Sequence, residues 1–166
     1  MRTSLRCAVV VIAAIAVVAV GSVRAIERRP LPAFTLTDLN GQPVASETLP
    51  TAGKWLLIYV QPKCDSCDAL LRTIDVRDQP GLPSRMAIVV GRADAAAAAA
   101  QAARFPDLSA AHWYAGRDRS ASEALKVVSA PMVFGVRDDR LEWSVAGIVP
   151  DLDGVKSALI TWAGHR

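Results

Sequence analysis

Two kinds of hydrophobic pattern alternate along the chain and predict its secondary structure. Residues 55–60 and 86–90 are continuous apolar runs of strand length, which is typical of strands buried on both faces of a sheet. The first run is followed by apolar residues at helical spacing, which predict a helix from Cys64 to about residue 77. The second run is followed by an alanine-rich segment at 94–104, which predicts a plain surface helix because alanine is the best helix former.

The remaining segments complete an α/β pattern. Apolar and polar residues alternate over 34–39, and a turn at Asn40-Gly41 followed by Val44 predicts a small hairpin. The later predicted elements, in chain order, are a strand at 113–115, a helix at 118–128, paired strands at 131–136 and 141–147 around an Asp138-Asp139 turn, and a final helix capped by Asp151. This order predicts a central mixed sheet with helices on both faces.

The first 25 residues are expected to be a signal peptide or an N-terminal membrane anchor. Residues 7–23 carry no charge and follow two arginines, and about 17 apolar residues suit either a short membrane span or a long signal core. Small residues at 23 and 25 suit cleavage after Ala25, whereas the arginines that flank this position favour retention as an anchor. A buried helix is the poorer alternative, because no polar residue gives the segment a solvent face.

The domain that follows is expected to work in the periplasm, either tethered to the inner membrane by residues 7–23 or released by cleavage. Residues 26–32 are charged and contain proline, which predicts a short tether to a domain spanning 33–166. The chain of 166 residues has 19 Lys and Arg against 16 Asp and Glu, a net charge of +3. Because the excess lies in the leader, at Arg2, Arg6 and Arg24, the domain itself is neutral and lacks the basic surface that nucleic-acid binding requires.

Cys64 and Cys67 form the one chemically distinctive motif of the domain. Two intervening residues bring both sulfurs within bonding reach once the first helical turn forms. A cysteine at a helix N-terminus is stabilised as a thiolate, the species that attacks in disulfide exchange. Cys67, one turn further along, is expected to be shielded and suited to resolving a mixed disulfide. Lys63 should favour the thiolate, whereas Asp65 and Asp68 should oppose it, so the sign of their combined effect stays open.

Three alternatives compete with a redox role for the cysteine pair. A structural zinc site needs about four ligands, and outside the leader only His112 and His165 could join the two cysteines, without ligand spacing. Copper binding by the two thiols is a second alternative. A purely structural disulfide is the third, although so short a loop removes little chain entropy. A CxxC between a buried strand and a helix of an exported domain favours redox chemistry.

Three segments resemble the thioredoxin-like fold, and in particular the membrane-tethered TlpA/ResA-like redoxins. "FTLTDLNGQPV" at 34–44 is similar to the extra N-terminal β-hairpin of that branch, and "WLLIYVQPKCDSC" at 55–67 to its strand and active-site segment. "ALKVVSAPMVFGVRDDRLEWSVAGIV" at 124–149 is similar to the stretch with the family's cis-proline, hairpin and glycine. MauD-type maturation proteins, which are tethered redoxins with other CxxC contents, resemble the chain too.

The resemblance implies a three-layer α/β/α sandwich with thiol:disulfide oxidoreductase activity. Pro131 would be the cis-proline facing the cysteines, and the backbone at Ala130 would pair with an extended substrate; the alternative is an ordinary trans proline at a strand start. Lys63 and Ser66 stand where the family usually has Trp and often Pro, and Ile58 replaces a buried acid or amide.

The expected function is therefore electron exchange with client proteins through Cys64 and Cys67. The resemblance implies clients in cytochrome or metalloprotein maturation and a membrane protein as electron donor or acceptor, and the sequence implies no cofactor. A copper-binding metallochaperone and a redox-inert client-binding module on the same scaffold are the alternatives.

Overall fold

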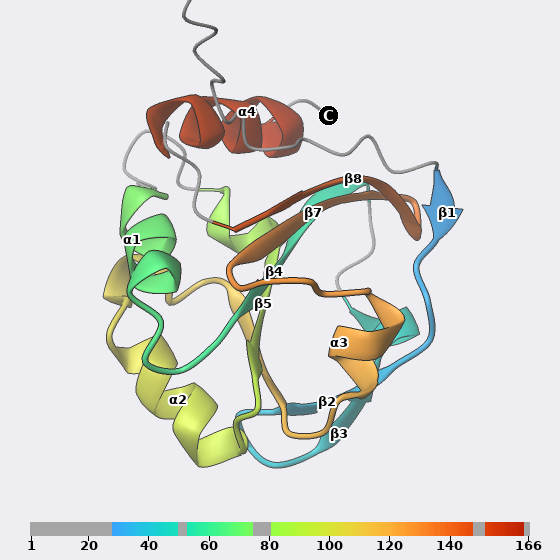
Figure 1. The fold of residues 1–166 in the computed structure, drawn as a ribbon, viewed down its shortest axis with the longest axis vertical. Helices are drawn as coiled ribbons and strands as arrows, with labels where there is room; N and C mark the ends of the chain where they lie inside the picture. Colours follow the sequence, from blue (N-terminus) through green and yellow to red (C-terminus); the bar gives the residue numbers. More distant parts are fainter. Residues whose placement is uncertain (1–27, 50–52, 75–80, 148–151, 165–166) are drawn as a thin grey trace, which may run out of the picture.

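One mixed sheet forms the centre of the molecule. The computed structural model describes residues 28–49, 53–74, 81–147 and 152–164. In this part of the chain eight strands join in the order β1-β8-β7-β4-β5-β6-β2-β3 (Figure 1). The strands are β1 Arg29–Pro30, β2 Thr35–Asp38, β3 Pro43–Ala45, β4 Lys54–Val60, β5 Met86–Gly91, β6 His112–Gly116, β7 Met132–Arg137 and β8 Arg140–Ala146.

The direction of the strands divides the sheet into a parallel centre and antiparallel flanks. β4 pairs in parallel with β5, and β5 with β6, whereas β7 runs antiparallel to β4 and β8 antiparallel to β7. The hairpin β2–β3 extends the sheet because β2 pairs antiparallel with β6. Across that junction Tyr114 faces Asp38, and burial together with the Asp38 charge raises the pKa of the Tyr114 phenol above its usual value.

Helices cover both faces of the sheet. The described α-helices are α1 Asp65–Thr73, α2 Ala95–Ala103, α3 Ser120–Ala124 and α4 Leu152–Gly164, and short 3-10 turns occupy Ser46–Thr48, Pro83–Arg85 and Pro106–Leu108. α1, α2 and α4 lie on one face and α3 on the other (Figure 1). The structure therefore has the three layers that the order of the predicted elements indicated.

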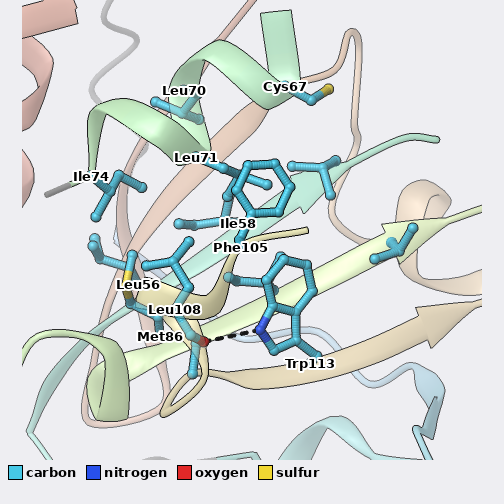
Figure 2. Close-up of a cluster of buried hydrophobic side chains, with 14 of the residues drawn as sticks. Leu56, Ile58, Cys67, Leu70, Leu71, Ile74, Met86, Phe105, Leu108 and Trp113 are labelled. Carbon is cyan, nitrogen blue, oxygen red and sulfur yellow. Dashed lines mark hydrogen bonds between the residues drawn. The ribbon is translucent and has the colours of Figure 1, made fainter. Parts of the chain in front are cut away.

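The hydrophobic core consists of two clusters, one on each face of the sheet, because successive side chains of a strand point to opposite faces. On β4, Ile58 points toward α1 and α2, whereas Leu57 and Tyr59 point toward α3. Figure 2 shows the first of these clusters, in which Cys67 stands at one end and the Trp113 indole N–H donates to the Leu108 carbonyl at 3.2 Å. Burial on both faces explains why β4 and β5 read as unbroken apolar runs in the sequence.

Most predicted elements are confirmed, and two helices are shorter than predicted. α1 ends at Thr73 instead of near residue 77, and Ile74 leaves the helical conformation while its side chain stays buried. Ile74 thus continues the apolar spacing without belonging to the helix. α3 covers only Ser120–Ala124 of the predicted 118–128, because Lys126 adopts a left-handed backbone at φ 57°.

The segment predicted as a tether takes part in the sheet where it is described. β1 pairs with Arg140 and Leu141 of β8, and the Arg28 guanidinium forms an ion pair with Glu142 at 2.7 Å. The predicted leader at 1–25 lies outside the described residues, as does Asp151, the predicted cap of the last helix. Within the described ranges, no helix combines the length and the apolar character that crossing a membrane requires.

Gly135 makes room for an aromatic contact between the sheet and α4. It lies opposite Trp143 in the β7–β8 pair, and a β-carbon added at position 135 would stand 2.2 Å from Cε2 of the Trp143 indole. The Trp143 ring in turn meets the Trp162 ring of α4 edge-on, with centroids 5.7 Å apart. Only a glycine therefore lets this tryptophan lie against β7.

We expect Gly135→Ala to lower the free energy of unfolding by about 1–3 kcal/mol, because the Trp143 ring must move and disturb the packing of α4. Urea unfolding followed by tryptophan fluorescence measures the change. Gly81→Ala is the matched control, because no heavy atom lies within 4 Å of the added carbon. An equal loss of stability in the two variants would contradict the proposed contact.

Candidate active site

The cysteine pair lies where β4 passes into α1. β4 ends at Val60, and a turn through Lys63, whose backbone is left-handed at φ 56°, brings the chain to Cys64. Cys64 is the N-cap residue of α1, and its sulfur accepts a hydrogen bond from the backbone N–H of Cys67 at 3.2 Å. The predicted placement of Cys64 at a helix N-terminus is therefore confirmed. Free backbone N–H groups at such a terminus stabilise a negative sulfur.

The two cysteines are bonded to each other and differ in exposure. The S–S distance is 2.19 Å and the Cα atoms are 5.2 Å apart. Cys64 is partly exposed, whereas Cys67 is 0% exposed in the cluster with Leu70, Leu71 and Ile58 (Figure 2). An incoming sulfur therefore reaches Cys64 and not Cys67. Ile58, which stands where many TlpA/ResA-like redoxins have a buried acid or amide, is fully buried in this apolar cluster.

The segment before β7 lies beside Cys64. The Ala130-Pro131 peptide bond is cis, as the resemblance implied. The Ala130 carbonyl oxygen is 3.9 Å from the Cys64 sulfur, and Pro131 is buried while Ala130 is only partly so. Because β4 and β7 are neighbouring strands, residues far apart in sequence meet here. The structure thus brings Cys64, Cys67, Ala130 and Pro131 together.

Charged and polar side chains surround the first turn of α1. Lys63 and Asp65, on either side of Cys64, are both exposed. The Ser66 hydroxyl lies 3.3 Å from the Cys64 sulfur. Asp68, which follows Cys67, forms an ion pair with Arg104 and accepts a hydrogen bond from the Gln101 amide at 3.0 Å. The site therefore contains two side chains from the end of α2.

Sequence reasoning missed the part that Ser66, Gln101 and Arg104 play around the cysteines. In the sequence, Ser66 stands out only because the TlpA/ResA-like redoxins often have proline there, and the segment at 94–104 predicts only a surface helix. Gln101 is 5% exposed and faces α1, so α2 has a polar contact inside the molecule. The available signal was the single glutamine in an otherwise all-alanine stretch at 95–103.

Disulfide exchange is the chemistry that this arrangement supports. An accessible sulfur at a helix N-terminus serves as attacking thiolate or as the sulfur attacked, and a shielded sulfur at bonding distance closes the ring. Among the residues that the structure describes, no three or more His, Cys, Asp and Glu side chains gather where they could hold a metal ion.

Comparison with solved structures identifies the fold. A secreted Mycobacterium tuberculosis disulfide oxidoreductase, homologous to Escherichia coli DsbE, superposes with a TM-score of 0.62 at 19% identity, covering 77% of this chain and 95% of that one. A thio-disulfide isomerase from Thermus thermophilus gives 0.58 at 23% identity over 83% and 96%. A thiol peroxidase from Chromobacterium violaceum gives 0.61 at 15% identity over 86% and 90%.

These similarities confirm a thioredoxin-like fold, as the resemblance of the sequence implied. No protein-family model matches the chain, and no curated protein matches it. At these identities the similarities establish the fold alone.

We expect Ser66→Ala to make the reduction potential of the cysteine pair more negative by about 10–30 mV. The hydroxyl can donate to a negative Cys64 sulfur, and a hydrogen bond to a charged group at a partly exposed site is worth roughly 0.5–1.4 kcal/mol. Equilibration with glutathione buffers measures the potential. Ser66→Thr, which keeps a hydroxyl, is the control and should stay near the parent value; a shift of equal size in both variants would contradict this role.

Proposed function

We propose that this chain is an extracytoplasmic thiol:disulfide oxidoreductase that exchanges electrons with client proteins through Cys64 and Cys67. The observation that carries the proposal is the unequal exposure of two bonded cysteines at a helix N-terminus. A purely structural disulfide does not require that one of its two sulfurs be accessible to another protein. The thioredoxin-like fold of known disulfide oxidoreductases supports the same chemistry.

The reaction proceeds through a mixed disulfide in either direction. As a reductant, the Cys64 thiolate attacks a client disulfide and one client sulfur leaves as a thiolate; Cys67 then attacks the Cys64 sulfur and releases the second client thiol. As an oxidant, a client thiolate attacks the Cys64 sulfur and Cys67 leaves as a thiolate; a second client thiolate then displaces Cys64. Two electrons pass in each case, and solvent exchanges the protons.

The side chains beside Cys64 set the preferred direction. Lys63 stabilises the thiolate and so favours the reduced protein, which makes it an oxidant of clients, whereas Asp65 favours a reductant. The backbone at Ala130 and Pro131 receives the extended client segment, because its carbonyl lies next to the sulfur under attack.

The proposed location is the periplasm, with residues 7–23 as a tether to the inner membrane or with release after cleavage at Ala25. The secreted mycobacterial oxidoreductase supports an extracytoplasmic site for this fold. The proposed clients are proteins of cytochrome or metalloenzyme maturation, and a membrane protein would supply or remove the electrons.

Trapping with Cys67→Ser tests the proposal. The parent protein is the full chain with Cys7→Ala, in which Cys64 and Cys67 are the only cysteines, and each variant is made in this parent. Without a resolving thiol, Cys64 should accumulate mixed disulfides with exported proteins, which non-reducing gels and mass spectrometry detect. Cys64→Ser is the matched control and should trap few, because Cys67 is buried. The parent should show a reduction potential of about −120 to −270 mV.

Equal trapping by the two variants, or no exchange with glutathione in the parent, would refute the redox proposal. A stable copper complex without exchange activity would instead support the metallochaperone alternative.

A further inference from the structure

We propose that Arg104, held by Gln101, is a positioning residue that sets the redox balance of the cysteine pair by cancelling the charge of Asp68. This inference rests on the proposed function and assigns a role to the end of α2. The carboxylate of Asp68 lies one helical turn after Cys64 and directly after Cys67, and the chain offers it a cation from another helix.

The contacts around Asp68 form a closed network. Arg104 reaches both carboxylate oxygens, one through Nη2 and the other through Nη1 at 3.4 Å. The Gln101 amide donates to Asp68 at 3.0 Å, and its oxygen accepts from Nη1 of Arg104 at 3.0 Å. A two-pronged arginine contact with a glutamine bridge holds the guanidinium in one place.

The burial of Gln101 and the partial burial of Asp68 distinguish this network from an ordinary surface ion pair. The Asp68 side chain is 16% exposed and the Arg104 side chain 44%, while Gln101 is 5% exposed. The Arg104 guanidinium also lies over the Phe105 ring, 5.7 Å from its centroid. Four contacts with Asp68, Gln101 and Phe105 therefore keep the cation next to α1, where solvent screens it only in part.

Several charged side chains lie near Cys64, and Arg104 changes their balance by neutralising Asp68. Lys63 and Asp65 are exposed and opposite in sign, and Arg72 lies two turns further along α1. An uncompensated Asp68 would repel a thiolate formed at the start of α1 and favour the disulfide. With Arg104 in place, the Asp68–Arg104 pair is neutral overall, so the Cys64 thiolate persists to lower pH. A more stable thiolate favours the reduced protein, and the cysteine pair becomes a better oxidant.

Two single variants and their double test this inference in the full chain, again with Cys7→Ala. Arg104→Gln exposes the Asp68 charge, so the pH midpoint of Cys64 alkylation by iodoacetamide should rise by about half to one pH unit. Asp68→Asn leaves Arg104 without an anion, so the midpoint should fall. Asp68→Asn with Arg104→Gln removes both charges and should return the midpoint to the parent value.

The equilibrium constant for reduction by glutathione should follow the same order above the alkylation midpoint. Arg104→Gln should decrease it about three- to tenfold, and Asp68→Asn should increase it. Added salt should shrink both shifts, because screening weakens charge interactions. Arg72→Gln is the matched control: it removes a cation from α1 that stands 5.6 Å from the same Phe105 ring, and should shift the midpoint less than Arg104→Gln.

A purely mechanical clamp between α1 and α2 gives a different pattern. Each single variant breaks that clamp, so both would then move the midpoint in the same direction and the double variant would not recover. That pattern, or no shift in any variant, overturns the inference. Failure of the proposed function is recognised separately, because the parent itself would then show no exchange with glutathione.

Discussion

The burial of β4 on both faces is the constraint on which the site depends. A strand packed against α1, α2 and α4 on one side and α3 on the other cannot slide or rotate without exposing apolar side chains. Its carboxyl end therefore delivers Cys64 to one defined position at the edge of the core. The hydrogen bond from the Cys67 N–H to the Cys64 sulfur then starts α1 at that position.

The same packing makes the two cysteines chemically unequal. α1 lays Cys67, Leu70 and Leu71 against the sheet, so the second sulfur belongs to the core while the first stays at its rim. β7 pairs with β4 over most of its length and so carries Ala130 to the Cys64 sulfur from far along the chain. An apolar core thus accounts for which sulfur is reached and for what lies beside it.

Local sequence signals predicted the elements that depend on local physics. The apolar runs of β4 and β5, the Asn40-Gly41 hairpin and the Asp138-Asp139 turn, where both residues take a positive φ, all have short-range causes. Helix ends were harder, because tertiary packing buries Ile74 outside α1 and so extends the apolar spacing beyond the helix. The cysteine pair was recognisable since its spacing and its place after a buried strand are local too.

Charge interactions between residues far apart in the sequence could not be predicted from local patterns. From the sequence, Asp65 and Asp68 both oppose a thiolate at Cys64, since both follow it within one helical turn. The fold separates them: Asp65 stays exposed, whereas Asp68 meets a cation that lies 36 residues further along the chain. The fold therefore pairs one of these two neighbouring acids with a cation and leaves the other exposed to solvent. The charge around Cys64 thus depends on which residues the fold brings together, and a sum over its sequence neighbours alone leaves out the cation that pairs with Asp68.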